Sequence, residues 1–490
     1  MVVRRVKFSL RIILLVYLIS GINQFLHSQY LDGIEILSGT FRGNNERNYY
    51  GSSAPDKLDV IWKFNLGEGE TVISRKLGSR IWAGAGWTGQ PLLVKEGNDT
   101  FLIQGAYDHN LRKINARDGN EVWKYAFDDV VKGTATLFMN PAARNKEESL
   151  IILQGSRLGA GNYLDSKYIP SYRAISYFTG NELWRLDIKW AGSYSRDVDG
   201  SALILKDTAY IGFENGIFTV FDPDPAKATI RDSMLQPLII QEEKLYTYKD
   251  ILLHKNNVVT ESSPALLRNR IYLASGSGHV YGYNLDTRQL DWDYFIGSDM
   301  DGSVVITSDS CLMISVEKQY IPGKGGIFKL DPSKTPSESV VWYFEVADTL
   351  FSGWEGGVIG TVGINDKYVE NGVPHLAAIA ALDGYLYIVD HRNIDSTRTS
   401  TGPDGISEYP APVLIDKLKL GPAISSPVLT NDKLIFTGYN GIYLYSYSAD
   451  NNFEKLDYYP ASCESSPLIM DKRIYVASRN GYLYCFGEIP

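Results

Sequence analysis

The residues best suited to chemistry in this sequence are carboxylates that recur just ahead of short predicted strands. The pattern Asp-x-Asp-Gly-Ser occurs twice, with its second acid at Asp199 and at Asp301, and single glutamates hold the corresponding place in other units. Converging carboxylates suit a hard cation such as Ca²⁺, which takes about 6–8 oxygen ligands. Without an ion they form a hydrated ring of acids whose repulsion raises some pKa values, and the sequence leaves both alternatives open. The predicted metal-site residues are Asp199, Glu261, Asp301, Glu355 and Glu464.

Other kinds of chemistry lack the residues that they need. The six histidines show no H-E-x-x-H spacing, so no zinc site is expected. The sequence contains neither the G-x-S-x-G elbow of a hydrolase nor a phosphate-binding P-loop. Cys463 and Cys485 fall on predicted strands that are not neighbours, so we expect them, with Cys311, to be free and mostly buried thiols. No catalytic residue is predicted.

The elements that must position the carboxylates belong to an internal repeat. A tryptophan recurs within a short strand, a Ser-Ser-Pro strand start recurs three times, and turns followed by alternating aromatics recur as well. The unit is about 40 residues long, the length of a four-stranded propeller blade whose inner strand lines the axis. The third and sixth units carry insertions, around residues 230–259 and 391–412. Eight units begin near Gln90, Gly133, Gly200, Ser262, Gly302, Gly357, Ser425 and Ser465.

The two ends of the chain complete each other. The last unit, from Ser465 to Phe486, has only three strands, and residues 58–66 supply a surplus strand at the front. Pairing the two would close the ring and leave no open edge. We therefore predict an all-β fold in which residues 58–490 form an eight-bladed β-propeller. The N-terminal strand of this range completes the last blade and so closes the ring. The recurring tryptophans are expected to pack between blades; they are Trp62, Trp123, Trp184, Trp292 and Trp342.

Two further tryptophans lie in an insertion between the closing strand and the first blade. Trp82 and Trp87 accompany Gly84-Ala-Gly86-Trp-Thr-Gly89, which matches G-x-G-x-x-G. A dinucleotide site needs a helix after these glycines, but residues 90–95 are predicted as strand, so we exclude that reading. Exposed tryptophan is costly unless it is used, and we expect this loop to cover one mouth of the ring or to contact a partner or ligand.

The N-terminus and the charge indicate where the protein works. Four basic residues precede an apolar run over residues 12–22, which is typical of a secretory signal peptide ending near residue 28. The alternative is an uncleaved N-terminal anchor. Cleavage would take the net charge from −9 to −13 and leave no segment that could span a membrane. This acidic balance disfavours nucleic acid as a partner. Residues 29–57 form a lead-in, and we expect an exported protein in the periplasm, on the cell surface or outside the cell.

The repeats resemble those of the pyrroloquinoline-quinone (PQQ) propellers. The fullest match runs from Ala106 to Trp123, with a turn, an alternating strand, a glycine turn and a tryptophan strand, and Phe41-Arg-Gly-Asn44 looks like the family's lead-in. The resemblance implies the fold and two lines of work. One branch consists of quinoprotein dehydrogenases, which hold PQQ and Ca²⁺ at the centre of the propeller. The other consists of non-enzymatic scaffolds such as the propeller lipoprotein of outer-membrane β-barrel assembly.

The chain departs from both branches. It lacks the vicinal cysteine pair that stacks on the quinone and has no cysteine after the leader for lipid attachment. We therefore expect a non-enzymatic propeller, closer to the scaffolds, that binds a protein or another envelope component as a monomer within a complex. No cofactor is expected, PQQ included, and Ca²⁺ at the carboxylates is the alternative. The alternatives are a quinoprotein-type oxidoreductase and a carbohydrate-binding propeller.

Overall fold

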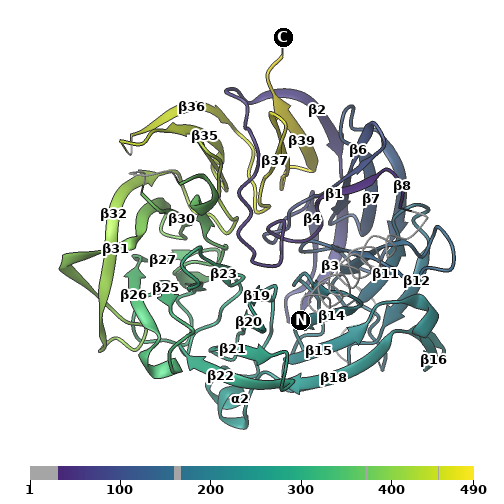
Figure 1. Ribbon diagram of the computed structural model, residues 1–490, viewed down its shortest axis with the longest axis horizontal. Helices are drawn as coiled ribbons and strands as arrows, with labels where there is room; N and C mark the ends of the chain where they lie inside the picture. The colour runs from purple at the N-terminus through teal and green to yellow at the C-terminus, as the bar shows by residue number, and fades with distance from the viewer. Residues whose placement is uncertain (1–30, 75, 159–166, 370–373, 451, 490) are drawn as a thin grey trace, which may run out of the picture.

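The computed structural model describes residues 31–74, 76–158, 167–369, 374–450 and 452–489. They form eight antiparallel blades, seven with four strands and one with a fifth, arranged as a ring around a central axis (Figure 1). The predicted all-β, eight-bladed propeller is thus confirmed. The predicted signal peptide, residues 1–28, lies outside the described residues.

The first four blades follow one another along the chain, with the inner strand first. Blade 1 contains β5 (Leu92–Glu96), β6 (Asp99–Gly105), β7 (Asn110–Asn115) and β8 (Glu121–Ala126). Blade 2 contains β9 (Thr136–Met139), β10 (Leu150–Gly155), β11 (Tyr172–Ser176) and β12 (Glu182–Leu186). Blade 3 contains β13 (Leu203–Leu205), β14 (Thr208–Gly212), β15 (Ile217–Asp222) and β18 (Leu238–Lys244). Blade 4 contains β19 (Ala265–Leu267), β20 (Arg270–Ala274), β21 (His279–Asn284) and β22 (Gln289–Phe295).

The last four blades continue the ring. Blade 5 contains β23 (Val305–Ile306), β24 (Leu312–Val316), β25 (Gly326–Leu330) and β26 (Val340–Glu345). Blade 6 contains β29 (Gly363–Ile364), β30 (Leu376–Ala380), β31 (Tyr385–Thr401) and β32 (Glu408–Lys419). Blade 7 contains β33 (Val428–Leu429), β34 (Lys433–Gly438), β35 (Gly441–Tyr447) and β36 (Phe453–Tyr459). Blade 8 contains β37 (Leu468–Met470), β38 (Arg473–Ala477), β39 (Tyr482–Gly487) and β2 (Asp59–Asn65).

The predicted closure is present, since β2 from the front of the chain pairs with β39 and places Trp62 opposite Cys485. One strand was not predicted. It is β1 (Ile34–Ser38) of the lead-in, which pairs with β5 as a fifth strand of blade 1. The two predicted insertions also appear. The first holds the hairpin β16 (Thr229–Arg231) and β17 (Met234–Gln236) with helix α2 (Tyr248–Leu253), and the second is the long β31–β32 hairpin.

Two more hairpins and three 3-10 turns complete the described elements. The hairpins are β3 (Glu68–Ser74) with β4 (Gly78–Ala83), and β27 (Asp348–Phe351) with β28 (Trp354–Gly356). The 3-10 turns are η1 (Pro225–Lys227), η2 (Pro336–Glu338) and η3 (Asp366–Tyr368).

The recurring tryptophans join neighbouring blades, as predicted. Each lies on an outer strand just past a β-bulge, and its indole N–H donates to a carbonyl of the next blade along. The donor–acceptor pairs are Trp62–Ala116 (3.1 Å), Trp123–Tyr177 (3.0 Å), Trp184–Pro223 (2.9 Å), Trp292–Lys334 (3.2 Å) and Trp342–His391 (3.0 Å). The apolar core also lies between blades, because single clusters combine residues of adjoining sheets.

Hydroxyl groups at the beginnings of the inner strands link the blades into a circle. The Ser201 N–H donates to Ser263 Oγ (2.9 Å), and the Ser263 N–H donates to Ser303 Oγ (2.9 Å). The same relation continues through the pairs Ser303–Thr361, Thr361–Ser426 and Ser426–Ser466. The circle closes through the carbonyl of Thr88, which accepts from Ser466 Oγ (3.0 Å), and through Thr134, which joins Gln90 to Ser201. The small-residue strand starts seen in the sequence are therefore the joints of the ring.

Residues 40–51 of the lead-in, here called the axial plug, run through the centre of the ring (Figure 1). Arg47 is fully buried and donates to the carbonyls of Pro264 (2.8 Å), Ser201 (3.2 Å) and Ala202 (3.1 Å). Arg42, also fully buried, donates to Pro427 and Val362. Further hydrogen bonds of the plug reach the remaining four blades at Gln90, Thr136, Ile306 and Ile469. The plug therefore binds all eight inner edges.

Candidate functional site

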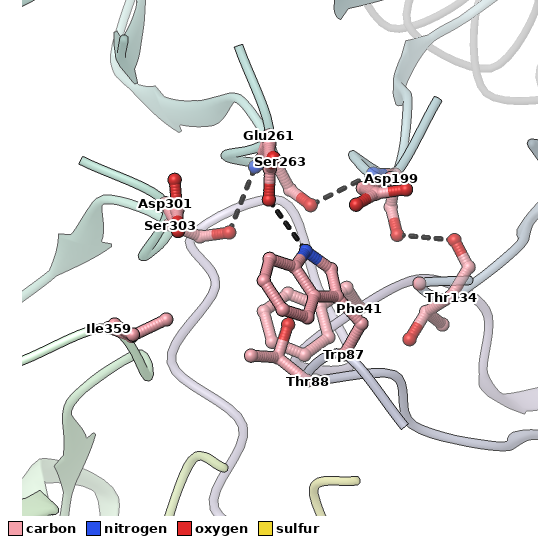
Figure 2. Close-up of a pocket in the computed structure, with 12 residues that line it drawn as sticks. Phe41, Trp87, Thr88, Thr134, Asp199, Glu261, Ser263, Asp301, Ser303 and Ile359 are labelled. Carbon is pink, nitrogen blue, oxygen red and sulfur yellow. Dashed lines mark hydrogen bonds between the residues drawn. The ribbon is translucent and has the colours of Figure 1, made fainter. Parts of the chain in front are cut away.

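Seven carboxylates gather on one side of the ring at its central mouth, and we call this set the acidic mouth. They lie in segments that join an outer strand to the next inner strand, or in turns between second and third strands, which share one face of a propeller. Figure 2 shows three of them, Asp199, Glu261 and Asp301, around Trp87. The members are Asp197, Asp199, Glu214, Glu261, Asp299, Asp301 and Glu317.

On one side of the acidic mouth, basic side chains offset the charge of the carboxylates. The Lys132 ammonium lies 2.5 Å from Asp199 Oδ2 and 3.8 Å from Glu214 Oε1. Burial opposes the charge of Lys132, but these carboxylates raise its pKa well above the usual value. Asp197 pairs with Arg157 at 2.8 Å. Lysine and arginine therefore offset charge on this side, although burial and neighbouring acids still raise the pKa of Asp199, Glu214 and Glu261.

The other half has no such partner. Asp299, Asp301 and Glu317 each offer a carboxylate oxygen within 4.8 Å of the other two, and no ion pair joins any of them to a basic residue in the described ranges. Burial, with help from neighbouring carboxylates at Asp301 and Glu317, raises the pKa of Asp299 to about 6 and those of the other two well above their usual range. Asp299 Oδ2 accepts from Asn257 Nδ2 (2.6 Å), but its Oδ1 is buried without a hydrogen-bond partner. This group needs protons or a cation.

The structure brings together three of the five predicted metal-site residues. Asp199, Glu261 and Asp301 lie in the acidic mouth. Glu355 does not, because it sits exposed on the β27–β28 hairpin that lengthens its segment. Glu464 faces the same opening but is neutralised by Arg479 at 3.0 Å.

Sequence reasoning missed four members and the internal lysine. Asp197 and Asp299 are the first acids of the two D-x-D-G-S patterns, of which only the second acids, Asp199 and Asp301, were predicted as site residues. Glu214 and Glu317 occupy the turn after the second strand in blades 3 and 5, so alignment of that turn across the repeats was the available signal. Lys132 stands directly before the glycine that begins its unit, the position that Asp199 and Asp301 hold in theirs, so alignment of the unit starts was the available signal.

Trp87 caps the acidic mouth. Its indole Nε1 donates to Glu261 Oε2 at 2.6 Å (Figure 2). Its ring lies 5.1 Å from the Lys132 ammonium, and its backbone N–H donates to Glu464 Oε2 at 3.4 Å. Both Trp87 and Thr88 have positive φ, 52° and 60°. Two such residues in a row cost about 1–3 kcal/mol each and mark a backbone held in place by its surroundings. This backbone conformation, held by its surroundings, places the indole over the axis.

Trp82 lies beside the cap rather than in it. Its ring packs on Tyr107 at 5.2 Å, between the guanidinium groups of Arg157 (5.5 Å) and Arg479 (5.7 Å). Gly84 and Gly86 allow this loop to approach blade 8, because a Cβ there would lie 1.7 Å from the Ser478 carbonyl and 2.3 Å from Glu464. Close packing therefore explains the G-x-G-x-x-G spacing.

The space left at the axis is small. The cavity lined by Trp87, Phe41, Asp199, Glu261 and Asp301 encloses about 10 Å³, enough for about one water molecule or ion. The tricyclic quinone implied by the family resemblance does not fit there while Trp87 and Phe41 hold these positions. The predicted free thiols are confirmed, since all three cysteines are buried and unpaired, so no disulfide faces the axis.

A second cluster of titratable groups lies between blades 5 and 6. Asp366 Oδ1 bonds to His375 Nδ1 (2.6 Å) and His391 Nε2 (2.9 Å), which the sequence spacing did not reveal. Lys329 Nζ lies 3.3 Å from His391 Nδ1. Because lysine only donates, His391 Nδ1 accepts and Nε2 carries the proton. The cluster is a buried hydrogen-bond network in which Nε2 is not available to a metal.

No helix in the described ranges is both long and apolar enough to cross a membrane. No protein-family model and no curated protein matches the sequence. Among solved structures, quinohemoprotein alcohol dehydrogenase from Comamonas testosteroni superposes with a TM-score of 0.58 at 13% identity, covering 93% of this chain and 81% of its own. A europium-containing methanol dehydrogenase gives a TM-score of 0.55 at 11% identity over 92% and 98%.

BamB from Moraxella catarrhalis gives a TM-score of 0.43 at 13% identity, covering 88% of this chain and all of its own. Identities this low establish a fold and no activity. The strand order, the number of blades and the two dehydrogenase superpositions all indicate the same fold. The chain has the eight-bladed propeller fold of the PQQ-type quinoproteins.

Proposed function

We propose that this protein is a non-enzymatic, exported propeller that binds a protein or another component of the cell envelope. The observation that carries the proposal is the filled axis, where Trp87, Phe41 and the axial plug leave about 10 Å³. A quinoprotein dehydrogenase must hold its cofactor and substrate at such a centre. Here the Trp87 indole and the Lys132 ammonium are already bonded to carboxylates, and the charged groups that remain at the mouth are Asp299, Asp301 and Glu317.

The partner face proposed is the one that carries the acidic mouth. Large apolar side chains stand exposed on the segments that join outer to inner strands. Leu350 is 82% exposed at the tip of the β27–β28 hairpin, and Tyr248 of α2 is 75% exposed. Others on this side are Ile81, Trp190, Tyr194 and Leu252. Exposed apolar side chains around a charged centre are typical of an interaction surface, and the acids favour a partner that is basic at its centre.

A cation is the second part of the proposal. Asp299, Asp301 and Glu317 would hold Ca²⁺, since carboxylate oxygens are its preferred ligands. The buried and unpartnered Asp299 Oδ1 supports a ligand at this position. The ion would offset the charge that Lys132 and Arg157 leave uncompensated.

Site-specific photo-crosslinking in the native envelope tests the partner face. A photoreactive residue at position 350 should give a discrete crosslinked product. The matched control is Ile489, which is 62% exposed beyond the end of β39, on the face opposite the turns between second and third strands. Equal products from both positions, or none from position 350, would argue against this face.

Loading the purified protein with PQQ and Ca²⁺ tests the enzyme alternative. Stoichiometric quinone binding with dye-linked oxidation of an alcohol or sugar would overturn the non-enzymatic proposal. We expect neither the quinone absorbance nor turnover.

A further inference from the structure

The junction between blades 3 and 4 differs from the five junctions that an indole fills. In those five, the tryptophan is the residue just past the outer-strand bulge. In blade 3 the bulge falls between Val220 and Phe221, and the residue at the tryptophan position is Gln241, which pairs with Val220. The blade is regular in its pairing but lacks the large side chain.

Gln241 reproduces the polar contact of the indole without its bulk. Its Nε2 donates to the Arg288 carbonyl (2.9 Å), just as Trp292 donates to Lys334 in the next junction. Its Oε1 accepts from the Tyr283 hydroxyl (2.9 Å). The hydrogen bond between the blades is kept, while the aromatic surface that would cover the junction is missing.

A groove of about 440 Å³ opens at this place, within the range of sites that bind small ligands or single side chains. Its walls are apolar and aromatic, and they include Tyr210, Val220, Ile240, Leu266, Tyr283 and Leu285. Grooves also occur at junctions 4/5 and 8/1, but no residue of β22 or β2, the strands that carry Trp292 and Trp62, lines them. The groove at junction 3/4 alone of these reaches its outer strand.

The rim of the groove is basic. Lys206, Arg268 and Arg288 are exposed around it, against two acids: Asp207 in the lining and Glu243, whose Oε1 accepts from Gln241 Nε2 at 2.7 Å. This is a local excess of positive charge on a protein whose net charge is −9. An occupant that carries carboxylates would therefore be attracted to this place and repelled by most of the remaining surface.

We propose that this groove binds a tryptophan side chain presented by an acidic segment of a partner protein. The same fold seats an indole at the equivalent place five times, which sets the size and shape of the occupant. All nine tryptophans of the chain lie among the described residues, and none lines the groove, so the indole must come from another molecule. Buried tryptophan is among the side chains that contribute most to binding. The site is separate from the acidic mouth and does not depend on the function proposed for it.

The test uses the full mature protein and a labelled acidic pentapeptide with a central tryptophan, with binding followed by fluorescence anisotropy. We expect saturable binding, and a peptide with alanine at the centre should bind at least about tenfold more weakly. Equal affinity for the two peptides would overturn the proposal. Binding that also appears between copies of this chain, detected by sedimentation, would replace the partner by a second copy and overturn it as well.

Two variants locate the site. Gln241→Trp should fill the groove from within, abolish peptide binding and raise the melting temperature, as a sixth docked indole would. Lys206→Glu with Arg268→Glu changes only exposed side chains and should weaken binding at least about tenfold by reversing the rim charge. If Gln241→Trp fails to fold, the rim variant decides. Unchanged binding in a folded Gln241→Trp protein, or in the rim variant, would place the peptide elsewhere and reject the groove.

Discussion

The indole Nε1 of Trp87 lies 2.6 Å from Glu261 Oε2 and so joins the insertion ahead of blade 1 to the segment that enters blade 4. The two residues are far apart in the chain but meet across the axis of the ring. The bond supplies a donor to a buried carboxylate whose pKa burial and neighbouring acids raise well above the usual value. One side chain therefore closes the mouth and helps to stabilise its charge.

Replacing this indole should destabilise the protein in a specific way. Trp87→Phe keeps an aromatic ring but leaves Glu261 without the donor, and loss of a partner for a buried carboxylate costs about 1–3 kcal/mol or more. We expect a lower melting temperature in calorimetry. In a Glu261→Gln background the same change should cost less, because an amide tolerates the loss better. Equal costs in both backgrounds would mean that the bond does not couple the two residues.

The uncompensated half of the acidic mouth predicts an unusual pH dependence. A carboxyl whose pKa is raised in the folded state binds protons that the unfolded chain releases, so the free energy of unfolding falls as pH rises. The window starts near the unfolded value of about 4 and extends through about 6 for Asp299 and higher for Asp301 and Glu317. In EDTA we expect the melting temperature to fall between about pH 5 and pH 8. Asp299→Asn with Asp301→Asn should flatten that fall.

Calcium should act on the same residues. A cation that binds only the folded state stabilises it by about 2.7 kcal/mol at a hundredfold excess over Kd. In a chain this long that corresponds to a rise of a few degrees. The rise should vanish in the Asp299→Asn, Asp301→Asn protein. Asp199→Asn is the matched control, because Asp199 is paired with Lys132, and its loss should lower stability while the calcium response remains. A calcium effect that survives the double change would place the ion elsewhere.

The contrast between the two halves shows where sequence reasoning stops. The repeats of tryptophan, Ser-Ser-Pro and turn residues fix the blades and the closure by β2, because each is a local pattern tied to one strand. Asp199 and Asp301 could be placed at the mouth for the same reason. Lys132 holds the same position in its unit, but its pairing with Asp199 could not be predicted, since that acid belongs to blade 3 and the contact exists only after the ring has closed. Glu355 was misplaced because a hairpin changes the path of its segment without changing the repeat.

The axial plug is the other feature that local patterns did not reveal. The Phe-Arg-Gly-Asn motif resembles a lead-in, yet its Arg42, together with Arg47 three residues beyond the motif, holds the ring from inside. Arg47 donates to a carbonyl of blade 4 (Pro264), one of blade 3 (Ser201) and one of the plug itself (Phe41). Among the described residues it makes no ion pair. A charge held by carbonyl groups and the Thr40 hydroxyl, without a carboxylate, depends on all of these acceptors being in place.

Arg47→Leu should therefore weaken the whole ring. The change leaves several buried carbonyls without donors, each costing about 1–3 kcal/mol, and we expect a large fall in melting temperature or failure to fold. Arg80→Leu is the control, since Arg80 also donates to two carbonyls but is exposed on β4. That change should stay within about 0.5 kcal/mol of the parent. Similar losses from the two variants would show that the plug adds nothing beyond an ordinary surface contact.

The closure makes the last prediction. In blade 8, β2 covers the outer edge of β39 over six paired residues from Asp59 to Asn65, with Trp62 reaching Ala116 of blade 1. Deleting residues 58–66 would expose the edge of β39 and remove one of the five indole bonds. An unpaired edge strand favours pairing with another chain, so we expect insoluble protein or oligomers in size-exclusion chromatography. Trp62→Phe in the intact chain isolates the indole: it keeps β2 in the sheet, removes the bond to Ala116, and should cost about 1 kcal/mol while the protein stays monomeric. A deletion variant that remained monomeric with the melting temperature of the parent would rule out this closure.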